Sequence, residues 1–356
     1  MCIDTNGDVL FMLGPDAYTP DEFENGVALY KTSDGICNVI DKNGTIVFSS
    51  KDGLFDDVIV HGDGYFAVYK YMESFDEAGY EILFLNSSGE RVIGYTDLLD
   101  EVPELIYCGD GIFANCTWRS AGGSNKYTFI NVKDDTYFEV GGIAHNNDLS
   151  NIFVDGVGLV ELGQGRMNDV PALIYADGTV KELNITDYNY YKYGKIADGG
   201  FVFTSYYNDK VESVRFYDIA TETVTELGNY GERVKLSRLE GLHFDNGHLL
   251  LPLVGADGKN YYTIIDKSGQ NLFDPVACES AYAEGEDRIV VKYEDKTVVY
   301  NGKGETVFEL PAGQSIDSYQ SGMARLVGKD HSIQDIYIDL EGNILFDDEV
   351  LFTLEG

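Results

Sequence analysis

The sequence has few of the residues that cross-link a fold or hold a metal. Its five cysteines, Cys2, Cys37, Cys108, Cys116 and Cys278, are scattered, odd in number and without a CxxC pair, which argues against both a disulfide framework and a zinc site. The histidines show no HExxH spacing, and the chain has neither a GxSxG elbow nor a GxxxxGK[ST] phosphate loop. We therefore expect no metal and no cofactor, and we assign no catalytic residue.

Basic residues are also scarce, with 25 Lys and Arg against 61 Asp and Glu and a formal net charge of -36. Such a surface repels phosphate groups, which disfavours nucleic acid and anionic membranes as partners. The chain lacks a run of eighteen apolar residues, so membrane insertion is not expected. Met1 to Leu13 has no signal-peptide pattern and begins within a repeat, so we expect a native leader to have been trimmed. That favours an extracellular or cell-envelope protein, with the cytoplasm as the alternative; the oligomeric state is not predicted.

Glycine, by contrast, is abundant, with 40 Gly against 7 Pro, and it marks a repeat of about forty residues. From Cys37 to Phe48, two strand-forming runs flank a turn that Asp41 opens and Gly44 closes, which predicts a β-hairpin. The closing glycine recurs at Gly7, Gly44, Gly89, Gly178, Gly269, Gly304 and Gly342. The opening side chains are expected to accept backbone N–H bonds at Asp4, Asp41, Asp266 and Asp339. Phenylalanine recurs four residues after the glycine, which implies a shared apolar slot for Phe11, Phe48, Phe273, Phe308 and Phe346.

A second glycine turn precedes a short apolar strand in each repeat, mostly as Asp-Gly or Asn-Gly, which favour tight hairpins. The strands that follow open at Val27, Tyr65, Ile112, Val157, Phe201, His248, Arg288 and Met323. Four short antiparallel strands in about forty residues are typical of a propeller blade. We predict an all-β protein with one domain over residues 1–356, a β-propeller of about eight four-stranded blades closed by the N- and C-terminal strands. The count is seven if the N-terminal half-unit displaces part of residues 322–356.

Three stretches carry a family resemblance. They read Gly26-Val27-Ala28-Leu29 leading to Val39-Ile40-Asp41-Lys42-Asn43-Gly44, then Tyr262 to Gly269, and Tyr337 to Gly342. This order resembles the bacterial WG-type β-repeats, in degenerate copies over most of the chain. The Trp-Gly pair that names the family is absent, because Trp118 precedes an arginine. The resemblance implies a bacterial propeller-like or envelope protein and brings no catalytic residues with it.

Tyrosines cluster beside acidic residues in the middle of the chain, where rings could stack on sugars and carboxylates could bind hydroxyls. Strand residues alternate sides, so about half of each cluster should be packing. The ligand-binding candidates are Tyr188, Tyr190, Tyr191, Tyr193, Tyr206 and Tyr207. We expect a non-catalytic interaction module with a protein or carbohydrate ligand on one propeller face. The alternative is a glycan-active hydrolase or lyase with carboxylates in the central channel, which needs paired acids that the sequence cannot identify.

Overall fold

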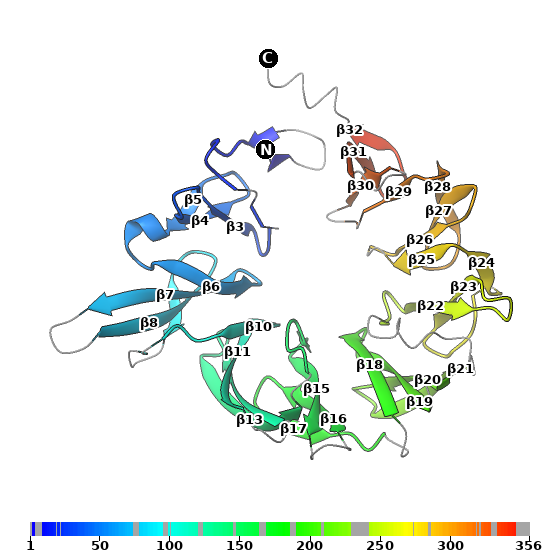
Figure 1. The fold of residues 1–356 in the computed structure, drawn as a ribbon, viewed down its shortest axis with the longest axis horizontal. Coiled ribbons are helices and arrows are strands. Elements are labelled where there is room, and N and C mark those ends of the chain that lie inside the picture. Colours follow the sequence, from blue (N-terminus) through cyan, green and yellow to red (C-terminus); the bar gives the residue numbers. More distant parts are fainter. Residues whose placement is uncertain are drawn as a thin grey trace. The chain divides into compact units, whose positions relative to one another are not determined.

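The computed structural model describes residues 2–3, 9–18, 20–21, 23–73, 78–94, 99, 101–119, 124–144, 147–163, 169–185, 190–207, 210–228, 242–272, 274–283, 286–317, 319, 322–328 and 333–346. Within these ranges the protein is all-β, and its one helix is the short 3-10 turn η1 (Ser50–Asp52), far too short to cross a membrane (Figure 1). The chain divides into two compact units, which hold the described residues up to Asn184 and those from Ile185 onward. Each unit is considered by itself.

In the first unit, consecutive strands pair antiparallel to form four sheets. The smaller sheets are β1 (Cys2–Ile3) with β2 (Val9–Phe11), then β3 (Val27–Lys31), β4 (Cys37–Asp41) and β5 (Ile46–Ser49), then β6 (Asp57–Gly62), β7 (Tyr65–Glu73), β8 (Ala78–Leu85) and β9 (Arg91–Gly94). The larger sheet contains β10 (Leu105–Gly109), β11 (Ile112–Arg119), β12 (Ser124–Asn131), β13 (Thr136–Ala144), β14 (Phe153–Val154), β15 (Val157–Gly163), β16 (Asp169–Tyr175) and β17 (Val180–Glu182). It consists of two four-stranded meanders, joined by the bridge between Ile143 and Leu162.

The second unit repeats this arrangement in four further antiparallel sheets. They are β18 (Tyr190–Ala197) to β21 (Thr223–Gly228), with β19 (Gly200–Tyr207) and β20 (Lys210–Asp218) between; β22 (His248–Val254), β23 (Asn260–Asp266) and β24 (Val276–Cys278); β25 (Ser280–Ala283), β26 (Arg288–Lys292), β27 (Lys296–Asn301) and β28 (Thr306–Pro311); and β29 (Ser315–Ile316), β30 (Met323–Val327), β31 (Ile333–Asp339) and β32 (Ile344–Phe346). Each predicted opening strand is present within one residue of its expected start, as β3, β7, β11, β15, β19, β22, β26 and β30. The all-β class and the antiparallel repeats are confirmed, while ring closure, blade count and a single domain stay predictions.

The turn between the last two strands of a repeat is held by the side chain that opens it. Asp41 Oδ1 accepts the backbone N–H of Asn43 at 2.9 Å and of Thr45 at 2.8 Å. The same pair of bonds, to the residues two and four positions on, forms at Asn86, Asp266, Asn301 and Asp339. The predicted role of these side chains is confirmed, except at Asp4, which lies outside the described residues.

The glycine that closes this turn receives the recurrent phenylalanine of the preceding repeat. Gly44 and Gly89 both have a φ of 76°, and a Cβ added to them would lie 2.4 Å from the ring of Phe11 and 2.7 Å from that of Phe48. Gly342 stands in the same relation to Phe308, at 2.5 Å. The predicted apolar slot is thus the surface of the next turn. Phe273 and the side chain of Phe346 lie outside the described residues.

The Asp-Gly turns also connect successive repeats. At these turns the residue before glycine has a positive φ, 54° at Asp110, as a tight hairpin turn requires. Its carboxylate, or that of the residue before it, accepts a backbone N–H from the corresponding turn of the next repeat. The pairs are Glu24 with Asp63 at 2.7 Å, Asp110 with Gly156 at 2.6 Å, Asp198 with Gly247, and Glu286 with Gly322 at 2.9 Å. The acid therefore links neighbouring sheets as well as shaping its own turn.

Acid should weaken the carboxylate turns. Hydrogen bonds within these turns lower the pKa of three aspartates. The main cause is the N–H of Thr45 at Asp41 and the hydroxyl of Ser268 at Asp266. At Asp339, desolvation raises the pKa, but the hydrogen bonds from Asn343 and other turn groups outweigh it. A lowered pKa in the folded state contributes stability that is complete above the unfolded value of about 3.9 and is lost as the pH falls through the folded value. Acid unfolding should reflect this loss.

The triple variant D41N/D266N/D339N tests this expectation, because asparagine already makes the same bonds at Asn86 and Asn301. We expect wild-type stability at pH 7 and a smaller loss than wild type between pH 5 and pH 2.5, measured by urea unfolding. The other carboxylates are common to both proteins, so their titration cancels in the comparison. Equal losses in the two proteins would contradict the assignment.

Candidate functional site

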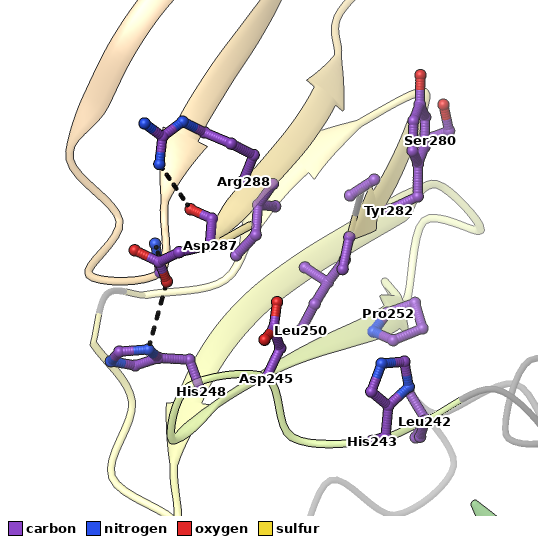
Figure 2. A pocket seen from close by; sticks show the side chains of 14 residues that line it. Leu242, His243, Asp245, His248, Leu250, Pro252, Ser280, Tyr282, Asp287 and Arg288 are labelled. Carbon is purple, nitrogen blue, oxygen red and sulfur yellow. Dashed lines mark hydrogen bonds and ion pairs between the residues drawn. The ribbon is translucent and has the colours of Figure 1, made fainter. Parts of the chain in front are cut away.

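A pocket of about 380 Å³ lies in the second unit between the β22–β24 sheet and the β25–β28 sheet (Figure 2). One wall comes from β22 and the other from β25 and the start of β26. Half of the fourteen lining residues, counting Tyr282, are apolar: Leu242, Leu250, Pro252, Ala281, Tyr282, Ala283 and Ile289. Polar side chains are grouped where the turns before β22 and β26 meet, and they include Asp245, His248 and Asp287.

The β22 wall follows from the alternation of side chains along a strand. Leu249, Leu251 and Leu253 are buried in the core between this sheet and the β18–β21 sheet. The intervening Leu250 and Pro252 therefore line the pocket on the opposite face. β22 is an edge strand in the described part of its sheet, and an edge tolerates proline because no neighbour there needs its missing N–H.

Asp245 and His248 are positioned by a two-residue hairpin. The backbone groups of the two residues exchange hydrogen bonds of 2.9 and 3.0 Å, and Asn246 and Gly247 between them have φ values of 49° and 81°. A positive φ at both central positions is the signature of the turns that Asn-Gly favours. Asp245 and His248 consequently enter the same pocket from the two ends of one turn (Figure 2).

Asp287 completes the polar end from the neighbouring sheet. Its Oδ1 accepts the backbone N–H of Gly302 at 3.1 Å and lies 3.9 Å from Nδ1 of His248. That nitrogen is buried and has no hydrogen-bond partner in the described residues. A Cβ on Gly302 would lie 2.0 Å from the Asp287 oxygen and 2.7 Å from the His248 nitrogen, so glycine is required for this close approach.

Two further side chains around the pocket are fixed by bonds to the scaffold. Arg288 donates from Nε to the carbonyl of Leu340 at 3.1 Å and from Nη1 to those of Glu286 and Asp287 at 3.4 and 3.3 Å. It forms no ion pair with any carboxylate that the structure describes. The hydroxyl of Tyr282 bonds to that of Ser315, and its ring packs against the core on the opposite face of the β25–β28 sheet. The pocket is thus built from groups whose positions are already set.

Five of the six tyrosines singled out by the sequence lie elsewhere, on β18 and β19. Tyr190 is opposite Tyr206 in the strand register, and Tyr193 packs with ring centroids 6.1 Å from Phe201 and 6.4 Å from Phe203. Tyr193 is therefore a packing residue, as expected for part of the cluster. Tyr188 and the side chains of Tyr190, Tyr191, Tyr206 and Tyr207 lie outside the described residues, so their predicted role in ligand binding stays a prediction.

Sequence reasoning missed the pocket, although two signals bear on it. The Asn246-Gly247 turn locates the start of β22, and the alternation along β22 assigns Leu250 and Pro252 to one face. Nothing in the sequence pairs that face with β25. In the described ranges, no three His, Cys, Asp or Glu side chains are grouped to hold a metal ion.

No family model and no curated protein matches the chain. Among solved structures, a crystal structure of the eukaryotic initiation factor is similar over 94% of this chain and 90% of that one, with a TM-score of 0.50 and 10% identity. BamB from Moraxella catarrhalis has a TM-score of 0.31 and 12% identity over 86% of this chain and 78% of its own. Prolyl oligopeptidase B from Galerina marginata has a TM-score of 0.38 and 10% identity over 88% of this chain and 55% of its own. The likeness to the initiation factor concerns the fold alone, and the other two TM-scores are too low to support a conclusion.

Proposed function

We propose that the chain is a non-catalytic binding module of the β-propeller type, which takes its ligand in the pocket between the β22–β24 and β25–β28 sheets. The preset pocket is the observation that supports this function: its apolar wall and its polar end are positioned by strand pairing, turns and backbone hydrogen bonds. A pocket of this kind, largely apolar with a few fixed polar groups, is typical of a binding site.

The architecture belongs to the same proposal. Eight blades, or seven, would form a ring closed by the N- and C-terminal strands, and the degenerate likeness to WG-type repeats agrees with such a ring. The links between successive Asp-Gly turns are the contacts that stacked blades need. Binding of a protein or carbohydrate through the tyrosine cluster is a further part of the proposal, with Tyr188, Tyr190, Tyr191, Tyr193, Tyr206 and Tyr207 as the candidate residues.

A glycan-active hydrolase or lyase is the second candidate, favoured because Asp245 and Asp287 line one pocket. The binding module ranks first because Asp287 is already engaged by the Gly302 N–H, and most of the remaining lining is apolar. Turnover of glycans that is abolished by D245N or D287N would reverse this order.

The variant A283W tests the binding function, since Ala283 is exposed at the end of β25 and lines the pocket. An indole ring there should fill the pocket without altering a polar group. The matched control is A277W on β24, which changes an equally exposed alanine that does not line the pocket. In a binding panel of glycans, peptides and small amines and acids, ligands of at least one class should bind wild type and A277W, and lose at least tenfold in affinity for A283W. Binding that A283W leaves unchanged throughout the panel would refute the proposal.

A further inference from the structure

We infer that the ligand of this pocket is an organic cation, with a primary ammonium group at Asp245 and Asp287 and an apolar stem against Leu250, Pro252 and Ala281. This inference rests on the proposed binding function. It adds the chemical class of the ligand, which neither the sequence pattern nor the likeness to solved structures provides.

The lining includes His243, His248 and Arg288, and it also holds two carboxylates, Asp245 and Asp287, that can accept further hydrogen bonds. A carboxylate can accept about four hydrogen bonds. Asp287 accepts one hydrogen bond from the N–H of Gly302 at 3.1 Å, and Asp245 accepts one from the side-chain amide of Asn246 at 3.1 Å. A primary ammonium has three donors and no acceptor, which matches the acceptor sites that remain on the two carboxylates.

Arg288 also lines the pocket, but within the described residues it forms no ion pair with Asp245 or Asp287. The donors of Arg288 are directed at the backbone carbonyls of Leu340, Glu286 and Asp287, and it has no carboxylate partner within the described ranges. The whole chain carries a net charge of -36, which attracts cations and repels anions over long distances. Charge complementarity therefore favours a positive ligand.

The rest of the pocket determines what must carry the ammonium. Leu250, Pro252 and Ala281 offer carbon surface, and their side chains have no hydrogen-bonding groups. A sugar would leave several hydroxyls without partners against this wall, and an unpaired polar group is costly to bury. An alkyl or aryl stem instead gains from the contact. A lysine side chain of a protein partner and a free amine share this chemistry.

The test uses the full chain and matched pairs of probes. N-acetyl-lysine methylamide is compared with its norleucine analogue, and phenethylammonium with 2-phenylethanol, by calorimetry or by chemical shifts of the pocket residues. We expect each ammonium probe to bind at least tenfold more tightly than its neutral partner. Tighter binding of the lysine probe would indicate a lysine side chain of a protein partner, and tighter binding of phenethylammonium would indicate a small free amine. Either order of affinities supports the inference.

The variants D245N and D287N test the role of the two carboxylates. Each should weaken the ammonium probes at least fivefold and leave the neutral probes unchanged. Asparagine tolerates the positive φ of 59° at position 287 and can still accept the Gly302 N–H, so the fold should survive. Wild-type chemical shifts away from the pocket would verify that it does.

The outcomes separate the two proposals. If neutral or anionic probes bind as tightly as the cations, and A283W abolishes their binding, then the cation inference is wrong and the binding function stands. If no probe of any charge binds in a way that A283W removes and A277W retains, then the pocket is not a binding site and both proposals fall.

Discussion

Replacing Gly89 with alanine is expected to lower the free energy of unfolding of the first unit by about 2–5 kcal/mol. Gly89 has a φ of 76°, where a Cβ costs about 1–2 kcal/mol. The added atom would also lie 2.7 Å from Cδ1 and 3.0 Å from Cβ of Phe48, and overpacking of this kind costs about 1–3 kcal/mol. Phe48 cannot easily retreat, because its ring is buried and contacts the rings of Phe55 and Phe66 at centroid distances of 6.0 and 5.3 Å.

Gly35 provides the matched control in the same unit. It closes the same kind of turn, with its N–H bonded to the carbonyl three residues back at 2.9 Å, and it has a φ of 85°. A Cβ there would meet nothing within 4 Å. Urea unfolding of G35A should therefore show only the backbone cost, about 1–2 kcal/mol. If G35A and G89A lose equal stability, then the contact with Phe48 contributes nothing.

The double variant F48A/G89A separates the two effects further. Removal of the ring abolishes the closest contact and leaves only the Cβ of residue 48 at 3.0 Å, so G89A should cost less in the F48A background than in the wild-type protein. Residues in contact are expected to depart from additivity in this way. Additive losses would show that the ring yields to the extra methyl group.

Local chemistry made the strands and turns predictable. Asp-Gly and Asn-Gly pairs fix a positive φ at two consecutive residues, so they locate the start of strands such as β7 and β11 with no knowledge of their neighbours. The side chain of Asp41 bonds within its own turn, so its role was equally local. The recurrence of phenylalanine at the position of Phe48 implied a common apolar slot, but the sequence could not show that the Phe48 ring packs against Gly89 of the next repeat.

Contacts between repeats could not be predicted, because they join residues about forty positions apart with no spacing rule. The carboxylate of Asp110 suits its own turn, and nothing marks its bond to the N–H of Gly156. For the same reason His248 and Asp287, which come from different sheets, gave no sign that they meet at one pocket. The tyrosine cluster attracted attention by composition alone, and the ring of Tyr193 proved to be part of the packing.

The contact between the two meanders of the largest sheet should be the most sensitive to substitution. Phe129 of β12 is fully buried, stacked on Phe138 at a centroid distance of 5.0 Å and edge-on to Phe153 of the next meander at 5.9 Å. We expect F129A to lose about 3–5 kcal/mol, because a fully buried aromatic ring leaves a cavity when it is truncated. F129L should lose less than F129A, because leucine fills part of the volume of the ring and leaves a smaller cavity.

Tyr137, which precedes Phe138 on β13, is 52% exposed and supplies the control, since Y137A should change stability by about 0.5 kcal/mol or less. The loss in F129A should also be local. The strand pairing between the meanders is a single bridge from Ile143 to Leu162, and one further backbone hydrogen bond runs from Asn151 N–H to the carbonyl of Tyr107 at 3.2 Å. The packing of Phe129 on Phe153 therefore carries much of the connection. Hydrogen exchange should therefore accelerate in β14 to β17 more than in β6 to β9. If exchange rises equally in both, then the first unit unfolds as one cooperative body, and the stability of each repeat depends on all its neighbours.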